Sequence, residues 1–164
     1  MQKKIKIISF SKKILKITKK HKVKLIINDD PLIAKIINAN GCHIGQNDYS
    51  IKYAKSVLNN NSIIGVTCHN SKKLALNSVK NGANYVAFGA FYSTKTKKTK
   101  FKAKLNILKW AKNKIEVPIV AIGGINQNNF QTILNAGADY IACSASIWSS
   151  PYGDPLTAVN LFKK

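Results

Sequence analysis

The segment SKKLALNSVKNGANYVAFG, residues 71–89, contains the signals of a helix, of its end and of a buried strand. Leu74, Ala75 and Val79 fall at helical spacing, and Gly82 stands where a glycine commonly ends a helix. The apolar run that follows, residues 85–89, is typical of a strand that is covered on both faces. The segment therefore predicts one helix–strand unit of an α/β protein.

The same passage from helix to strand occurs twice, because NGANYV at 81–86 is nearly repeated by AGADYI at 136–141. The predicted strands are Val23–Ile27, Gly41–Ile44, Ile63–Thr67, Tyr85–Gly89, Pro118–Ile122 and Tyr140–Cys143. The predicted helices are Ile5–Lys20, Pro31–Asn38, Ile51–Asn59, Ser71–Asn81, Leu105–Asn113 and Asn128–Asn135. This alternation predicts a parallel sheet in a single domain over residues 1–164, with residues 1–20 as a helical lead-in.

Six predicted strands leave two architectures open. The first is a (β/α)8 barrel of the TIM type that is incomplete on its N-terminal side, since such a barrel ordinarily needs about 200 residues or more. The second is an open doubly wound sheet, although no glycine fingerprint of a dinucleotide site follows the first strand. We favour the barrel and expect the two missing strands to precede the first predicted one.

The charge of the chain is extreme. Its 164 residues have a formal net charge of +21, and all 27 of the Lys and Arg residues are lysine. Nucleic-acid binding is one function that such a charge suggests. Against it, the lysines are spread along the whole chain, and base recognition and phosphate clamping favour arginine. We expect the positive field to attract small phosphorylated substrates instead.

The three cysteines, Cys42, Cys68 and Cys143, lie far apart. Neither their spacing nor their odd number suits a metal site or a disulfide framework, so we expect reduced thiols in a cytoplasmic protein. The basic N-terminus lacks the apolar core of a secretory signal, and no apolar stretch has the length of a membrane span. A membrane is therefore not an expected partner.

Carboxylates are scarce, yet aspartates follow the first two predicted strands. Asp29 comes directly after the apolar run at 25–27 and Asn28, and Asp48 follows the second strand. Because the ends of parallel strands meet at one edge of a sheet, the two carboxylates suggest Mg²⁺ bound together with a phosphate. The alternative is helix capping, by Asp29 or Asp30 before Pro31 and by Asp48 before the next helix.

Three later strand ends carry residues that suit phosphate. STKTK at 93–97 offers hydroxyl groups and amines, and the pair Gly123-Gly124 lets the backbone approach an anion, with a helix N-terminus expected just behind it. Small residues at 142–146 again permit close approach. The alternatives are a solvated lysine-rich loop and a tight glycine turn, but phosphate sites in barrels commonly use the last two loops.

His43 and His69 also lie near strand ends. No cysteine or serine nucleophile stands beside either histidine in a recognisable motif. We interpret both histidines as structural or peripheral.

These motifs occur together in the order and at the spacing of one known family. The quoted set is LIIND (25–29), HIGQND (43–48), IGVT (64–67), STKTK (93–97), PIVAIGGI (118–125) and DP (154–155). From about Lys24 onward the chain resembles thiamine-phosphate synthase. The resemblance implies a (β/α)8 barrel and a Mg²⁺-dependent transferase of thiamine biosynthesis. Such an enzyme condenses hydroxymethylpyrimidine diphosphate with thiazole phosphate to give thiamine phosphate and diphosphate.

The resemblance also implies which residues form the site. Asn28 would contact the pyrimidine, and Asp29 and Asp48 would bind Mg²⁺. Thr67 would help to bind the pyrimidine diphosphate, and Lys97 would bind its diphosphate group and neutralise the charge that develops there as it departs. Asn28 and Lys97 are thus the implied catalytic residues. The implied thiazole phosphate site consists of Thr94, Lys95, Thr96, Gly124, Ser144 and Ala145.

The sequence departs from the family in three places. Thr67 and Ala145 each stand where the family has a serine, and the family's two leading strands with their Gln-x-Arg-x-Lys segment have no counterpart, unless Lys3 or Lys4 is a remnant. Two unpaired apolar edges would remain, so we expect a homo-oligomer or poor solubility and little turnover by this polypeptide alone. One alternative is a barrel related to thiazole tautomerase, or one that binds thiazole phosphate without catalysis. The other is a basic nucleic-acid-binding protein.

Overall fold

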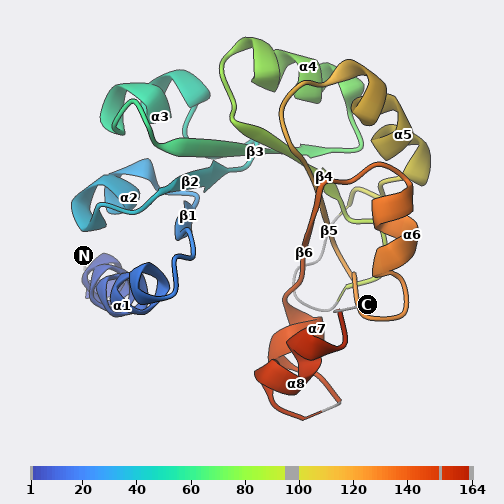
Figure 1. Ribbon diagram of the computed structural model, residues 1–164. Helices are drawn as coiled ribbons and strands as arrows, with labels where there is room; N and C mark the ends of the chain where they lie inside the picture. Colours follow the sequence, from blue (N-terminus) through green and yellow to red (C-terminus); the bar gives the residue numbers. More distant parts are fainter. Residues whose placement is uncertain (1, 95–99, 152, 163–164) are drawn as a thin grey trace.

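The computed structural model describes residues 2–94, 100–151 and 153–162, which form eight helices and one six-stranded parallel sheet (Figure 1). The strands are β1 (Ile26–Asn28), β2 (Gly41–Ile44), β3 (Ile63–His69), β4 (Tyr85–Gly89), β5 (Ile119–Ile122) and β6 (Tyr140–Ala142). The helices are α1 (Gln2–Lys20), α2 (Pro31–Ile37), α3 (Ile51–Val57), α4 (Lys72–Lys80), α5 (Leu105–Lys114), α6 (Phe130–Asn135), α7 (Ala145–Trp148) and α8 (Pro155–Asn160). Each strand pairs with the next one in sequence, in the order β1-β2-β3-β4-β5-β6.

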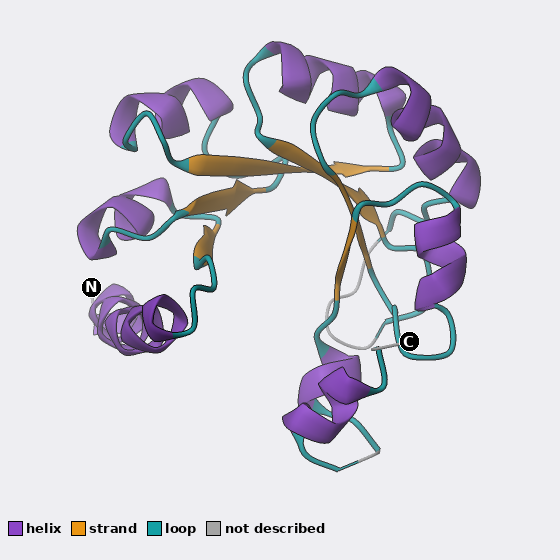
Figure 2. Cartoon of the chain, in the orientation of Figure 1, coloured by secondary structure: helices purple, strands orange, loops and turns teal. Residues whose placement is uncertain are grey.

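The sheet curls, and helices α2 to α6 cover its outer side (Figure 2). The core lies between the two layers and includes Cys42, Ile44, Val66, Cys68, Val86, Phe88, Ile119 and Ala121 from the strands, with Ile33, Ala54, Ala75, Leu108 and Ile133 from the helices. Successive side chains of a strand point to opposite faces, so the residues next to these core positions face the inside of the curve. His43, Thr67 and Tyr85 are three of them.

A repeated hydrogen-bond pattern at the amino ends of the strands explains the repeat in the sequence. Asn84 precedes β4; its N–H donates to the carbonyl of Ile64 (2.7 Å), and its side-chain oxygen accepts from the N–H of Ile64 (2.8 Å). Asp139 makes the same two bonds with Ile119, both 2.9 Å long. The pairs are Asn40 with Leu25, Asn84 with Ile64 and Asp139 with Ile119. Each pair ties a strand to the one before it.

The sheet stays open, because no strand of the described residues pairs with the outer edge of β1 or of β6. The six parallel strands form a curled half-barrel, as expected of a barrel that is incomplete on its N-terminal side, with α1 on one side of the opening and α7 and α8 on the other (Figure 1). Both sides expose large apolar side chains: Phe10 (63%) and Ile17 (61%) on α1, and Trp148 (74%) and Leu156 (70%) on α7 and α8. None of the described helices is long and apolar enough to cross a membrane.

All six predicted strands and all six predicted helices are present, with shifted ends. β1 begins at Ile26 rather than at Val23, because the N–H of Val23 donates to the carbonyl of Thr18 (2.8 Å) in the turn that leaves α1. β3 continues to His69, two residues beyond the predicted end, through an irregularity between Thr67 and His69.

The helices α7 and α8 were not among the predicted elements. The start of α8 nevertheless has a clear sequence signal, since Asp154 is followed by Pro155 at the first helical position. The Asp154 carboxylate accepts from the N–H groups of Leu156 (2.8 Å) and Thr157 (3.2 Å), as an N-cap does. The missed signal was this Asp-Pro pair.

Candidate active site at the carboxyl ends of the strands

The strands are parallel, so the loops that follow them gather at one edge of the sheet, which is where α/β proteins bind ligands. The sequence-predicted residues at this edge that the structure describes are Asn28, Asp29, Asp48, Thr67, Thr94, Gly124, Ser144 and Ala145. Lys95, Thr96 and Lys97 lie outside the described residues. The edge therefore brings together residues that are up to 117 positions apart in sequence, from 28 to 145.

The two aspartates after β1 have different surroundings. Asp30 caps α2: its Oδ1 accepts from two N–H groups of the first turn (3.0 and 3.2 Å), and its Oδ2 accepts from Lys4 Nζ (2.9 Å). Burial opposes ionisation of Asp30, but the hydrogen bonds from Lys4 and the first turn outweigh it, so the pKa of Asp30 is lowered. Asp29 has a left-handed backbone (φ 67°), and its N–H donates to the carbonyl of His43 (2.7 Å). Capping thus belongs to Asp30, and Asp29 is left as the candidate metal ligand.

Asp48 lies in the loop at 45–50, between β2 and α3. Its Oδ2 accepts from the N–H of Gly45 (2.7 Å), within its own loop. α3 is capped by Ser50, whose Oγ accepts from an N–H of the first turn (3.1 Å). The capping interpretation is therefore wrong for Asp48, and its carboxylate is held at the carboxyl edge of the sheet.

Asp29 and Asp48 suit a Mg²⁺ ion that takes its remaining ligands from elsewhere. Mg²⁺ is commonly held by one or two carboxylates together with waters and substrate phosphates. The two aspartates supply two such carboxylates from neighbouring loops, after β1 and after β2. The N–H of Asp29 also donates to the carbonyl of His43 in β2, which ties the first loop to that strand. In the part of the chain that the structure describes, no group of three or more His, Cys, Asp or Glu side chains could hold a metal ion. A Mg²⁺ ion that is also bound by a phosphate would need only these two carboxylates from the protein.

His43 lies in a polar cluster inside the curve of the sheet. Its Nδ1 is 2.9 Å from the hydroxyl of Tyr85, and its Nε2 is 2.8 Å from Thr67 Oγ1. Burial lowers the pKa of His43 to about 4 and raises that of Tyr85 to about 12, so both groups are neutral near pH 7. The side-chain amide of Gln46 donates to the carbonyl of Thr67. Thr67 is therefore held by both its hydroxyl and its carbonyl.

His69 differs from His43. It lies at the irregular end of β3, and its ring stacks on Phe101 with centroids 3.9 Å apart. This packing agrees with the structural interpretation of His69.

Gly124 makes room for the loop that follows β4. The N–H of Tyr92 donates to the carbonyl of Gly123 (3.0 Å), which places this loop against the glycine pair. A Cβ on Gly124, where φ is +64°, would lie 2.4 Å from the carbonyl oxygen of Ser93. The glycine is thus required by a protein segment that leads directly to Thr94, a contact that neither the anion nor the tight turn suggested by the sequence had included.

The loops after β5 and β6 are joined by a hydrogen bond from Ser146 Oγ to the carbonyl of Ile125 (2.8 Å). This bond brings the backbone at 144–145 near the glycine pair. The helix expected behind the glycine pair is present, but α6 begins at Phe130, two residues later than predicted. A turn at 126–129 intervenes, and Asn129 fixes it by donating from Nδ2 to the carbonyl of Gly124 (3.1 Å).

Comparison with known proteins agrees with this arrangement. The sequence profile described as thiamine monophosphate synthase matches residues 2–147 of this chain. The chain belongs to the thiamine monophosphate synthase family. The match begins near the start of α1, so the helical lead-in is part of the similarity, which the sequence motifs alone had traced only from about Lys24.

Members of this family with curated names support the assignment. The chain is 51% identical over 152 residues to thiamine-phosphate synthase of Pelagibacter ubique, covering 93% of this chain and 73% of that protein. It is 42% identical over 142 residues to the enzyme of Rhodospirillum centenum, covering 87% of this chain and 68% of that protein. For another relative, from Methylococcus capsulatus, it spans 57% of that protein's length.

A solved structure of thiamine phosphate pyrophosphorylase from Pyrococcus furiosus has the same arrangement of elements. Its TM-score is 0.87 at 26% identity, and the alignment covers 98% of this chain and 75% of that one. A 3-hexulose-6-phosphate synthase is similar in fold alone, with a TM-score of 0.62 at 19% identity over 88% of this chain and 75% of that one. The curled α/β half-barrel is thus the fold of the family over the matched region.

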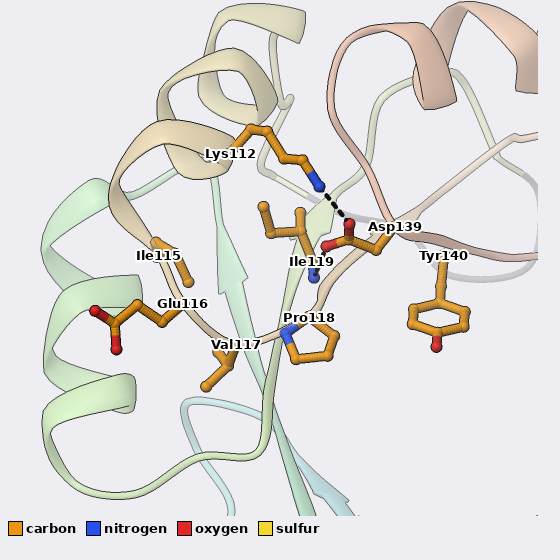
Figure 3. A pocket seen from close by; sticks show the side chains of 8 residues that line it. All are labelled: Lys112, Ile115, Glu116, Val117, Pro118, Ile119, Asp139 and Tyr140. Atoms are coloured by element: carbon orange, nitrogen blue, oxygen red, sulfur yellow. Dashed lines mark hydrogen bonds and ion pairs between the residues drawn. The ribbon is translucent and has the colours of Figure 1, made fainter.

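A hollow of about 320 Å³ lies at the opposite end of the sheet from the family's candidate site, between the starts of β5 and β6 (Figure 3). Two of its charged side chains, Lys112 and Asp139, are paired with each other. Asp139 accepts from the N–H of Ile119 (2.9 Å) and from Lys112 Nζ (2.7 Å), and Figure 3 shows the ion pair to Lys112. The lining of this hollow is therefore part of the junction between β5 and β6, and we do not assign it a substrate.

Sequence reasoning did not connect His43 with Tyr85 and Thr67, or Gln46 with Thr67. The available signal was the alternation of buried and inward positions. His43 pairs in register with Gly65, and Gly65 pairs with Tyr85. The three residues therefore lie side by side on the inner face.

Proposed function

We propose that this protein acts as a thiamine-phosphate synthase in thiamine biosynthesis. It would condense hydroxymethylpyrimidine diphosphate with thiazole phosphate, releasing thiamine phosphate and diphosphate. One observation carries the proposal: in a chain of the thiamine monophosphate synthase family, Asp29 and Asp48 lie at the carboxyl edge of the sheet and neither of them caps a helix. A complete barrel of the (β/α)8 type, of which these six strands would be part, belongs to the same proposal.

The residues of the inner edge divide the work on the pyrimidine diphosphate. Asn28, at the end of β1, is proposed to contact the pyrimidine ring, and Thr67 to donate a hydrogen bond to the diphosphate. Asp29 and Asp48 would hold Mg²⁺, which when bound supplies positive charge beside the leaving diphosphate. Lys97, outside the described residues, would add a further positive charge. No protein nucleophile is needed, because the thiazole nitrogen attacks the carbon that the diphosphate leaves.

The thiazole phosphate would lie where the loops after β4, β5 and β6 meet. Gly124 holds the loop that leads to Thr94, and the bond from Ser146 to Ile125 draws the backbone of Ser144 and Ala145 toward it. Lys95 and Thr96 are proposed partners of the same phosphate and lie outside the described residues. Backbone N–H groups and hydroxyls in such a place suit a phosphate group.

A cytoplasmic location is part of this proposal. Cys42 and Cys68 are buried free thiols, and burial raises the pKa of each to about 11. Such thiols are unreactive and suit a reducing compartment.

Two alternatives make different demands on the site. A protein related to thiazole tautomerase, or one that only binds thiazole phosphate, has no use for a diphosphate site with two metal-binding carboxylates. A nucleic-acid-binding protein would bind DNA with a steep dependence on salt, because counterions are released from the phosphates. Binding of thiazole phosphate without Mg²⁺-dependent binding of the pyrimidine diphosphate would favour the first alternative.

The proposal is tested by a single-turnover assay with the protein in excess over both substrates, since slow condensation is then still detected. Mass spectrometry should find thiamine phosphate and diphosphate with Mg²⁺ and neither product with EDTA. Asp48→Asn should slow product formation by about tenfold or more, because a charged ligand of a hard cation is lost. A wild-type chain that forms no product in excess protein, or forms it equally in EDTA, contradicts the proposal.

A further inference from the structure

We propose that His43 is a positioning residue that accepts a hydrogen bond from Tyr85 and donates one to Thr67. The Thr67 hydroxyl is then free to donate a hydrogen bond to the substrate diphosphate. The inference rests on the proposed function and extends it to two residues outside the substrate contacts. It concerns the direction of a hydrogen-bond chain through the inner face of the sheet.

The three residues are placed by the sheet itself. His43, Gly65 and Tyr85 stand level on β2, β3 and β4. A Cβ on Gly65 would lie 1.9 Å from Tyr85 Cζ and 2.3 Å from its hydroxyl oxygen, so the missing side chain lets the Tyr85 ring lie across β3. The ring then stacks on His43, with centroids 5.5 Å apart and planes 23° apart. Gly65 therefore makes the contact between β2 and β4 possible.

Both nitrogens of His43 are engaged by hydroxyl groups. Nδ1 is 2.9 Å from the Tyr85 hydroxyl, and Nε2 is 2.8 Å from Thr67 Oγ1. A neutral imidazole has one N–H and one acceptor nitrogen, so it donates on one side and accepts on the other. The chain of hydrogen bonds therefore runs in one direction, either from Tyr85 to Thr67 or from Thr67 to Tyr85.

The chemistry of the ligand selects the direction. Thr67 pairs with Ala87, two positions nearer the carboxyl edge of β4 than Tyr85, and so lies on the substrate side of the cluster. A diphosphate offers only acceptors, so a hydroxyl that faces it must donate. Thr67 can donate outward only if it accepts from Nε2–H, which leaves Nδ1 to accept from the Tyr85 hydroxyl. The expected tautomer of His43 has its proton on Nε2.

The backbone of Thr67 is fixed as well. Ile63 bonds to Asn40 on the β2 side, and alternate residues of a strand bond to the same neighbour, so the Thr67 carbonyl also faces β2. β2 ends at Ile44, and the amide of Gln46 donates to this carbonyl in its place. The side chain of Thr67 is therefore oriented by His43 on a backbone that Gln46 holds.

The test compares Tyr85→Phe, which keeps the ring over Gly65 and removes the donor, with Tyr53→Phe, the same change on the exposed side of α3. Calorimetry with inorganic diphosphate and Mg²⁺ should show roughly 3- to 10-fold weaker binding for Tyr85→Phe, the range of one neutral hydrogen bond. Tyr53→Phe should bind like the wild type. Circular dichroism and thermal unfolding of each variant confirm that it is folded.

Nitrogen-15 NMR of histidine-labelled protein supplies a readout that a merely structural role would not change. His43, assigned with His43→Gln, should carry its proton on Nε2 in the wild type with diphosphate bound, and should lose this preference in Tyr85→Phe. His43→Gln, which keeps a donor and an acceptor, should bind diphosphate better than His43→Leu. These two variants also decide the case if Tyr85→Phe does not fold.

The outcomes separate the inference from the proposed function. A wild type that binds diphosphate with the His43 proton on Nδ1 overturns the inference alone, as does unchanged affinity in Tyr85→Phe. Equal loss of affinity in His43→Gln and His43→Leu also overturns it. A wild type that binds no diphosphate with Mg²⁺ overturns the proposed function, and the inference with it.

Discussion

At the scale of single residues, neighbours with the same side chain have different tasks. Asp29 and Asp30 are adjacent carboxylates, and only the second caps α2 and pairs with Lys4. Sequence reasoning identified both as candidates and could not separate them, because the cap depends on which residue has the extended backbone. Asp30 has φ −122° and Asp29 has φ 67°. Asp30 thus has the extended backbone of an N-cap residue, and Asp29 does not.

This difference predicts unequal effects of the same substitution. Asp29→Asn should weaken Mg²⁺-dependent binding of the pyrimidine diphosphate by about tenfold or more, because a charged oxygen ligand is lost. Asp30→Asn should leave that binding within about twofold, because asparagine caps a helix as well as aspartate does and the exposed pair with Lys4 contributes little. Calorimetry at several Mg²⁺ concentrations measures both. A larger loss in Asp30→Asn would reverse the assignment.

Gly124 and Gly153 offer a second matched pair. Both have positive φ, +64° and +103°, but a Cβ on Gly124 would meet Ser93, whereas a Cβ on Gly153 would meet nothing within 4 Å. Alanine at either position should cost about 1–2 kcal/mol of stability through the left-handed backbone. Only Gly124→Ala should also lose binding of thiazole phosphate, because the loop leading to Thr94 is displaced. Its Mg²⁺-dependent binding of the pyrimidine diphosphate should persist.

The control for this pair is thermal unfolding of both variants beside the thiazole phosphate titrations. Normal binding of thiazole phosphate by Gly124→Ala would show that the glycine pair is only a turn. Loss of binding in Gly153→Ala as well would point to general destabilisation instead of local displacement.

At the scale of the elements, the strongest regularity is the junction at the amino ends of the strands. Asn40, Asn84 and Asp139 each bond with both backbone groups of a residue in or just before the preceding strand. The sequence revealed two of these junctions as a repeat, NGANYV and AGADYI, without their purpose. The structure shows this purpose. A side-chain oxygen accepts a hydrogen bond from a backbone N–H at the end of the strand ladder, where a buried donor without a partner would be costly.

Asp139 allows its two bonds to be separated. Asp139→Ala should lower the free energy of unfolding by about 1–3 kcal/mol, because the N–H of Ile119 loses its acceptor. Asp139→Asn keeps an amide oxygen for that N–H and loses only the exposed ion pair with Lys112, so it should lose less than about 1 kcal/mol. Urea denaturation of the two variants measures the difference. Equal losses would mean that the ion pair, and not the junction, carries the effect.

The elements were predictable because most are long or sharply ended apolar patterns. β4, for example, was predicted with both of its ends, since glycine and an apolar run bound it. What could not be predicted depends on contacts between segments that are distant in sequence. The place of His43 beside Tyr85 requires the register of three strands and the empty space over Gly65. The short α7, of four residues, has too little periodicity to be recognised.

At the scale of the whole molecule, the open sheet and the net charge have opposite effects on self-association. The outer edges of β1 and β6 have no strand partner among the described residues, and such edges favour association with another chain. A net charge of +21 favours separation. The balance between the two should therefore depend on salt, since ions screen the charge.

We accordingly expect self-association that increases with ionic strength, measured by sedimentation velocity at low and high salt. Phe10→Lys, on the exposed apolar side of α1, should shift the protein toward the monomer. Leu76→Lys is the matched control, because Leu76 is also exposed (50%) but lies on α4, away from the opening. A monodisperse monomer at every salt concentration would contradict the expectation, as would equal effects of the two substitutions.

The most direct measurement of the central claim is calorimetric titration of hydroxymethylpyrimidine diphosphate into the wild-type chain, with Mg²⁺ and with EDTA. The claim is that the carboxyl edge of this half-barrel binds a diphosphate through Mg²⁺ held by Asp29 and Asp48. We predict saturable binding with one site per chain in Mg²⁺ and its loss in EDTA. Equal binding under both conditions, or no binding in Mg²⁺ by folded protein, would contradict the claim.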